Sequence, residues 1–148
     1  MPIYMKFEGI VGPVKGKYAG WIELESCQFG NASRGRPNES GSSTAKISDL
    51  SITKLQDTTS AALFRSSTMG TRHKVTIDFV NGDGVAYLTL ELSDALIVNM
   101  SLSGSGGERA MESLTLNFTN MTFSTKPAAP AKDADPKNTQ SAWNMAAP

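Results

Sequence analysis

The chain has 148 residues, a length typical of one domain, and 39% of its residues are apolar. Its 14 basic residues balance 14 acidic residues, so the sequence lacks the basic excess expected of a nucleic-acid-binding protein. The longest apolar run, Ala95–Val98, is far shorter than the roughly 20 residues of a membrane-spanning helix. The segment from Met1 to Glu8 has no apolar signal-peptide core. We therefore expect a protein that folds in the cytoplasm, with no nucleic-acid partner and no membrane insertion.

Alternation of apolar and polar residues predicts strands along most of the chain, each with one face in a core. The alternating segments are residues 21–25, 50–53, 75–79, 88–92, 96–102 and 114–119. In the segment 96–102 the pattern places Leu96, Val98, Met100 and Leu102 inward. The apolar positions change parity at Met121, which predicts a β-bulge near Asn120.

Turn and helix signals separate these strands. Asn81–Gly84 contains residues that tolerate positive φ and predicts a hairpin. Asp57–Ser60 offers N-cap side chains, helix-forming residues follow, and Gly70 can end the segment, so we expect one short helix at about residues 60–69. The predicted fold is mainly β, an antiparallel β-barrel with one short flanking α-helix.

One domain followed by a tail of different composition is expected. Residues 1–125 contain all the alternating segments and form the β-barrel domain. From Lys126 the sequence becomes rich in proline and alanine, which predicts an extended C-terminal tail over residues 126–148. Its last apolar landmark is Trp143, which we expect to dock back onto the barrel.

The sequence offers little catalytic chemistry. The one histidine, His73, stands between Arg72 and Lys74 in a setting expected to be solvated and positive, and the one cysteine, Cys27, is expected to be a small buried apolar residue. No cluster has metal-ligand spacing, so we expect no metal, no cofactor and no enzymatic activity. Glu23 and Glu25 share a strand face at a spacing that a glycosidase pair could use, but such acids are common on solvated strand faces.

Two alternatives remain open from the residues alone. A small-ligand or carbohydrate-binding β module would use Trp21, Tyr18 and Tyr87, although these aromatics are scattered in the sequence. A hydrolase would be built around His73 or around the two glutamates. The glycine-rich segment Gly104–Gly107 does not complete a phosphate-binding motif, because position 109 is arginine.

Six segments, in order, resemble the Hcp (haemolysin-coregulated protein) family. They are 3–12, with its Gly-Ile-x-Gly ending; 22–30, which ends in an aromatic-Gly pair; 49–57, with the pattern Asp-Leu-Ser-Ile-Thr-Lys-x-x-Asp; 101–107, a Ser/Gly-rich loop; 112–118; and 142–144, Ala-Trp-Asn. Each motif alone is weak, and their order and spacing around one helix carry the resemblance.

The resemblance implies a tube protein of the type VI secretion system. Such proteins form homohexameric rings that stack into tubes, associate with a spike protein and a contractile sheath, carry small effector proteins in the lumen, and leave the cell by contraction without a signal peptide. We expect the polar loop of Arg34, Gly35, Arg36, Pro37, Asn38 and Glu39 to contact the next ring. The loop of Gly104, Ser105, Gly106, Gly107 and Glu108 is expected at a subunit contact. Gln28 resembles a lumen-facing position of the family.

Overall fold

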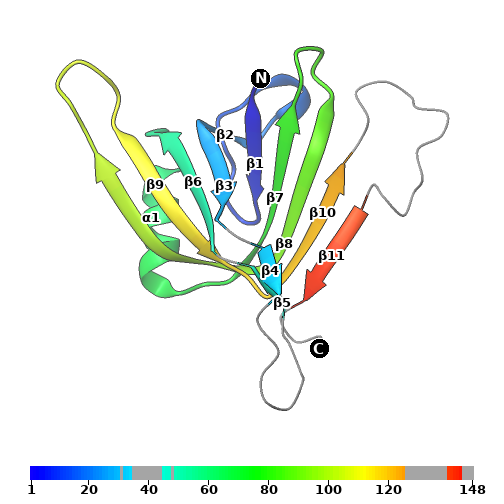
Figure 1. The fold of residues 1–148 in the computed structure, drawn as a ribbon. Coiled ribbons are helices and arrows are strands. Elements are labelled where there is room, and N and C mark those ends of the chain that lie inside the picture. Colours follow the sequence, from blue (N-terminus) through cyan, green and yellow to red (C-terminus); the bar gives the residue numbers. More distant parts are fainter. Residues whose placement is uncertain (31, 35–44, 48, 126–139, 145–148) are drawn as a thin grey trace.

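The structure, a computed structural model, describes residues 1–30, 32–34, 45–47, 49–125 and 140–144; for 32–34, 45–47, 140 and 143–144 it describes the backbone only. Figure 1 shows the elements in chain order. They are β1 (Ile3–Phe7), η1 (Gly16–Tyr18), β2 (Ile22–Leu24), β3 (Ser26–Phe29), β4 (Ala32–Arg34), β5 (Ala45–Ile47), β6 (Leu50–Leu55), α1 (Ser60–Met69), β7 (His73–Val80), β8 (Ala86–Ser103), β9 (Met111–Asn117), β10 (Asn120–Thr125) and β11 (Gln140–Asn144).

The long strand β8 is shared by two curved halves of one antiparallel sheet (Figure 1). Its first part pairs with β7 and β10, and the pairing continues through β1 to β2 and through β10 to β11; we call this the A-half. Its second part pairs with β9, and β6 and β3 follow; we call this the B-half. The short pair β4–β5 forms a separate ribbon.

The chain itself joins the two ends of this sheet. β2 and β3 are separated by Glu25 alone, and the Glu25 N–H donates to the Thr53 carbonyl at 2.8 Å. The chain thus passes directly from the A-half to the B-half. The ladder is open between β2 and β3, but the two halves enclose a common interior. The expected barrel-like antiparallel fold is therefore confirmed.

Asp94 marks the corner where β8 passes from one half to the other. Its φ of 54° lies in the left-handed region, which is unusual for a residue other than glycine. The Arg72 guanidinium donates to the Asp94 carbonyl at 2.9 Å, and the Thr119 hydroxyl donates to Asp94 Oδ2 at 3.0 Å. Contacts from two other segments thus hold the corner.

The corner changes which side chains of β8 face the interior. Ile97 is buried, whereas Val98 and Leu102 are 49% and 66% exposed. The inward face predicted for residues 96–102 is therefore wrong at these positions. Strict alternation is interrupted by the positive φ of Asp94 and by a register shift between Ile97 and Asn99. Met100, beyond the shift, again packs against the core.

The parity change after Phe118 comes from a break between two strands. β9 ends at Asn117 and pairs with the second part of β8, whereas β10 begins at Asn120 and pairs with the first part. The Thr119 N–H donates to the Ser93 carbonyl at 3.2 Å within this break. The predicted β-bulge near Asn120 is wrong, because the chain changes partner half there.

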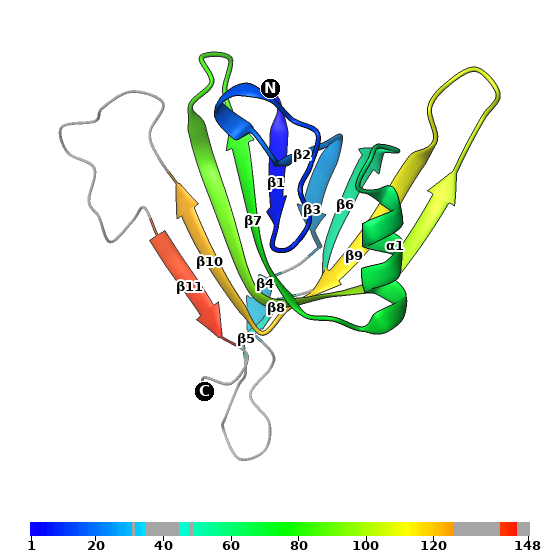
Figure 2. The ribbon, with the colours of Figure 1, turned by 180° about the vertical axis from the view of Figure 1, so that it is seen from behind.

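The helix and the hairpin form where the local signals place them. α1 spans Ser60–Met69 and ends at Gly70, whose φ of 65° is the left-handed conformation of a helix C-cap. Figure 2 shows the helix beside β8 and β9, and Leu63 is its fully buried side chain. Between β7 and β8, Asn81 Oδ1 accepts from the N–H groups of Asp83 and Val85 at 2.9 and 3.0 Å.

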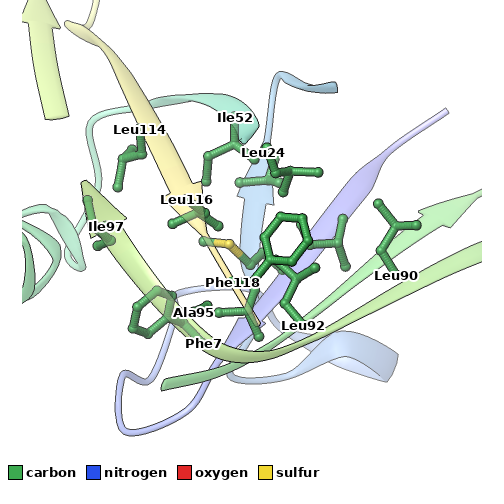
Figure 3. Close-up of a cluster of buried hydrophobic side chains, with 14 of the residues drawn as sticks. Phe7, Leu24, Ile52, Leu90, Leu92, Ala95, Ile97, Leu114, Leu116 and Phe118 are labelled. Atoms are coloured by element: carbon green, nitrogen blue, oxygen red, sulfur yellow. The ribbon is translucent and has the colours of Figure 1, made fainter. Parts of the chain in front are cut away.

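The core lies between the two halves of the sheet. Figure 3 shows its side chains pointing toward one another from both halves. The A-half contributes Phe7, Leu24, Leu90 and Leu92, and the B-half contributes Ile52, Ile97, Leu114 and Leu116. Burial of each such side chain contributes about 1.5–3 kcal/mol. The fold is thus held by apolar contact across the interior, and the outward faces are free to differ.

Candidate assembly surfaces

The outer face of the B-half carries uncharged polar side chains in two cross-strand rungs. From strand to strand, these rungs are Gln28–Ser51–Thr115–Asn99 and Ser26–Thr53–Ser113–Ser101. We call these eight side chains the neutral face. They point outward because the residues that alternate with them, such as Ile52 and Leu114, are fully buried.

Gln28 lies at the edge of the neutral face. It is exposed in β3 and pairs with Ser51. In the other rung the hydroxyls of Ser26 and Thr53 form a hydrogen bond of 2.5 Å. This face can therefore offer hydrogen bonds to a neighbouring molecule without presenting a charge from its own side chains.

The outer face of the A-half is charged. Its rungs are Glu23–Tyr4–Asp78–Thr89–Ser124 and Lys6–Thr76–Glu91–Thr122. Asp78 accepts from the Tyr18 hydroxyl and from the Thr89 hydroxyl, each at 2.8 Å. The two outer faces thus differ in charge although the same alternation produces both.

A small aromatic group covers part of the charged face. The ring of Tyr18 stacks on Tyr4 at 4.5 Å between centroids and meets Trp21 edge-on at 4.8 Å. Burial, followed by the hydrogen bond to Asp78, raises the pKa of Tyr18 to about 12. Two of the aromatics considered for a ligand site are therefore in contact, whereas Tyr87 lies elsewhere, with its centroid 6.2 Å from that of Phe79.

A buried ionic cluster joins the helix start to the B-half. Lys54 Nζ lies 2.6 Å from Glu112 Oε1 and 3.1 Å from Asp57 Oδ1, and it donates to the Leu55 carbonyl at 2.9 Å. Lys54 and Glu112 are 0% and 2% exposed. Charges this deeply buried are tolerated only when paired and hydrogen-bonded, and here both conditions are met.

The same cluster fixes the first turn of α1. The Ser60 hydroxyl donates to Glu112 Oε1 at 2.9 Å, and the Asp57 N–H donates to Ser60 Oγ at 3.0 Å. Asp57 Oδ1 accepts from the Thr59 N–H at 2.8 Å. These residues are N-cap candidates in the sequence, and in the structure they belong to a wider network that includes Glu112, 52 residues beyond Ser60.

The histidine and the cysteine lie in different settings. His73 is half-buried, with its ring centroid 4.8 Å from that of Phe7, so the expected solvated setting is wrong. Cys27 is half-buried against the core, and burial raises its pKa to about 12, which disfavours the reactive thiolate. Across the described ranges, no group of three or more His, Cys, Asp or Glu side chains could hold a metal ion.

The two glutamates face an open cleft. Glu23 and Glu25 are exposed and line a hollow of about 480 Å³ together with Asp57 and Arg109. Arg109 donates to the Gln56 carbonyl at the side of this hollow. The chain changes sheet halves at Glu25, so the pair does not form one regular strand face.

The structure describes one of the two predicted contact loops. Gly104–Glu108 joins β8 to β9, and every residue in it is exposed. The other loop begins at Arg34, which is the last residue of β4 and whose backbone pairs with Ala45. The rest of that loop, Gly35–Glu39, lies outside the described residues.

The end of the chain returns to the barrel through its backbone. In β11, Trp143 pairs with Met121 of β10, so the sheet continues beyond the residues 1–125 assigned to the barrel. The side chain of Trp143 lies outside the described part of the structure. Among the described residues, no helix is long and apolar enough to cross a membrane.

Residues 4–124 match the protein family described as "Type VI secretion system effector, Hcp". A relative, protein hcp1 of Pseudomonas aeruginosa, is 35% identical over 106 residues, which cover 67% of this chain and 64% of that protein, slightly less than two thirds of its length.

Solved structures with the same fold include Hcp2 and Hcp1 of Salmonella typhimurium. Hcp2 is 21% identical, with a TM-score of 0.74 over 99% of this chain and 98% of that one. Hcp1 is 17% identical, with a TM-score of 0.82 over 97% and 94%. The matched span contains the barrel, the helix and the ionic cluster, and the chain belongs to the Hcp family of type VI secretion proteins.

Proposed function

We propose that this chain is the structural tube subunit of a type VI secretion system. Copies associate into rings with a central channel, rings stack into a tube, and contraction of a sheath drives the tube out of the cell. The family membership supports this role, and the observation that carries it furthest is the neutral face of the B-half. The role is structural and requires no catalytic group.

We propose that the neutral face lines the channel, with Gln28 pointing into the lumen. A charged wall would hold cargo of opposite charge and repel cargo of like charge. A wall of hydroxyl and amide groups forms hydrogen bonds with water and with many protein surfaces, so it can enclose small effectors without fixing their charge. The charged face around Lys6, Asp78 and Glu91 is then left for the outside of the ring.

Unpaired strand edges favour association with other copies. Among the residues that the structure describes, β11 pairs only with β10, and the second part of β8 pairs only with β9. Such edges are ready to bind another chain unless something covers them. Head-to-tail contacts between identical copies form a closed ring when the rotation closes. We propose the hexameric ring as the closed form, and the loops Arg34–Glu39 and Gly104–Glu108 as contacts between rings or subunits.

In this role the protein has partners at its tip, around it and inside it. The tube carries a spike protein at its tip, lies inside the contractile sheath, and holds small effectors. The protein is made in the cytoplasm and exported by contraction. Removal of the sheath protein should therefore retain this protein inside the cell, which an immunoblot of culture supernatants measures.

Site-directed labelling tests the channel wall. In a Cys27→Ala background, Gln28→Cys and, as a matched control, Glu91→Cys are each labelled with a maleimide-gold particle before assembly. Negative-stain images of Gln28→Cys should show gold in the central hole, and those of Glu91→Cys should show gold outside the wall. Gold outside the ring for Gln28→Cys contradicts the channel assignment, and a monomer at every concentration of the unmodified protein contradicts the tube role.

A further inference from the structure

We propose that the groove beside α1 receives the Gly104–Glu108 tip of a second copy of this chain. The groove, of about 390 Å³, is lined by the helix on one side and by Gly9, Ile10, Thr71 and His73 on the other. The inference rests on the proposed function in one respect, because a tube needs repeated contacts between copies. It goes beyond that function by naming the two surfaces that are in contact between copies.

Two buried polar atoms in this groove lack hydrogen-bond partners within the described structure. They are Ser66 Oγ and His73 Nε2. Both atoms have almost no surface open to water, so a ligand reaches them only when the Ser66 and His73 side chains rotate toward the groove. A buried polar group without a partner costs about 1–3 kcal/mol, and a ligand that supplies the missing hydrogen bonds recovers that free energy.

The neighbours of Ser66 show that its isolation is not a property of the helix. The Ser67 hydroxyl donates to the Phe64 carbonyl at 2.7 Å, and the Thr68 hydroxyl donates to the Arg65 carbonyl at 3.0 Å. Helical serines commonly use such bonds to a preceding carbonyl. Ser66 makes none among the described residues and instead lines the groove.

The Gly104–Glu108 tip has the chemistry to complete this groove. Gly106 and Gly107 have no side chain, and a Cβ built on either meets no atom within 4 Å, so their peptide groups are open to another molecule. Bare peptide groups both donate and accept hydrogen bonds, and glycine allows a close backbone approach. They can therefore supply partners to a hydroxyl and an imidazole nitrogen together.

The groove and the region of the tip also match in charge and in exposed apolar side chains. Arg65 lines the groove and is exposed, and Glu108 is the exposed acid of the tip. The adjacent Arg109 already donates to the Gln56 carbonyl of its own chain. Leu102, which lies in β8 just before the tip, is 66% exposed, and Met69 of the groove is 70% exposed. A second copy would cover both apolar side chains.

The two surfaces lie at different ends of the molecule, so one copy cannot satisfy both. His73 pairs with Ala95 at the corner of β8. From Ala95 the strand runs on to Ser103, about 26 Å at roughly 3.3 Å per residue. The contact is therefore head-to-tail, and it repeats from copy to copy.

Disulfide trapping tests the contact directly. In a Cys27→Ala background, Ala62→Cys places a thiol on an exposed residue of the groove, and Gly106→Cys places one on the tip. When the two variants are mixed and oxidised, we expect a disulfide-linked dimer that neither variant forms alone. Gly82→Cys, in the other open hairpin, is the matched control and should not cross-link to Ala62→Cys. Equal cross-linking of Gly82→Cys and Gly106→Cys contradicts the proposal.

Charge reversal gives the second measurement. Arg65→Glu or Glu108→Lys should each raise the protein concentration needed for assembly by about tenfold, because an exposed ion pair becomes a repulsion. The double variant should restore assembly toward the original concentration in sedimentation velocity. If rings form and the single variants assemble as the unmodified protein does, the groove contact is wrong and the tube role stands. If the unmodified protein forms no ring, the tube role fails independently.

Discussion

Two neighbouring strands of the B-half carry both apolar pairs and an ionic pair of side chains on their inward faces. Along β6 and β9 the facing pairs are Leu50–Leu116, Ile52–Leu114 and Lys54–Glu112. All six side chains are almost fully buried. The apolar pairs gain free energy by leaving water, whereas the ionic pair must recover the cost of desolvating two charges.

The difference shows what the ionic pair does for the fold. An apolar pair holds the sheet against the core but cannot orient a helix end. Glu112 accepts from both Lys54 Nζ and the Ser60 hydroxyl, and Lys54 also contacts Asp57. The ionic pair thus fixes the position at which α1 begins, and the comparison predicts distinct effects for the two kinds of pair.

The largest effect is expected for Glu112→Ala. The change leaves Lys54 buried without its closest partner, and breaking one side of a buried pair costs about 3–5 kcal/mol. Urea unfolding should show this loss in the free energy of unfolding. A loss below about 1 kcal/mol contradicts a buried, paired Lys54.

The double variant Lys54→Met/Glu112→Leu sharpens the same comparison. Replacing both charges by apolar side chains of similar volume removes the unpaired charge, so we expect most of the lost stability to return. The Ser60 hydroxyl still lacks its acceptor, so hydrogen exchange in the first turn of α1 should be faster than in the unmodified protein.

Leu116→Ala should come next in size. It removes a fully buried side chain from the apolar part of the same face and leaves a cavity, which costs about 2–5 kcal/mol. Unlike Glu112→Ala, it should leave hydrogen exchange at the start of α1 unchanged relative to the rest of the barrel. Selective loosening of α1 in this variant would contradict the division of roles.

Ser60→Ala tests the helix connection alone. It removes a hydrogen bond to a buried carboxylate, for which about 1.5–3 kcal/mol is expected. The Asp57 N–H also loses its acceptor. Thermal unfolding followed by circular dichroism measures the loss. Ser67→Ala, in the same helix, removes a hydroxyl that donates to the Phe64 carbonyl and provides a matched control with a smaller effect.

The smallest effect is expected on the outward side of the same strands. Ser51→Ala, on the neutral face between Leu50 and Ile52, should change the free energy of unfolding by no more than about 0.5 kcal/mol. Any larger effect should appear in assembly, measured by sedimentation velocity, and not in the unfolding of the monomer. A loss of several kcal/mol in the monomer would contradict its outward position.

Regular alternation made most of the fold predictable from the sequence. The strands, the helix at 60–69 and the hairpin at Asn81–Gly84 follow from local signals. The corner at Asp94 does not, because an aspartate with positive φ depends on contacts from Arg72 and Thr119, which are distant in sequence. The same corner explains why the faces of Ile97 and Val98 were assigned wrongly.

The candidate surfaces were less predictable than the strands. Lys54 falls on an inward position of β6, which was a readable signal for a buried charge, but its partner Glu112 is known only from the register of β6 and β9. Gly12 belongs to the family-like Gly-Ile-x-Gly segment, and the structure supplies its reason: an added Cβ would lie 2.0 Å from the Trp21 carbonyl oxygen. The neutral face also appears only once the strands are placed in register.

An electron-microscopy reconstruction of the assembled protein, at a resolution that separates strands, tests the central claim most directly. The proposed role predicts a closed ring whose channel wall is the B-half, with the rung of Gln28, Ser51, Thr115 and Asn99 toward the lumen. A channel lined by the charged face of the A-half, with Lys6 and Glu91 inward, would contradict it.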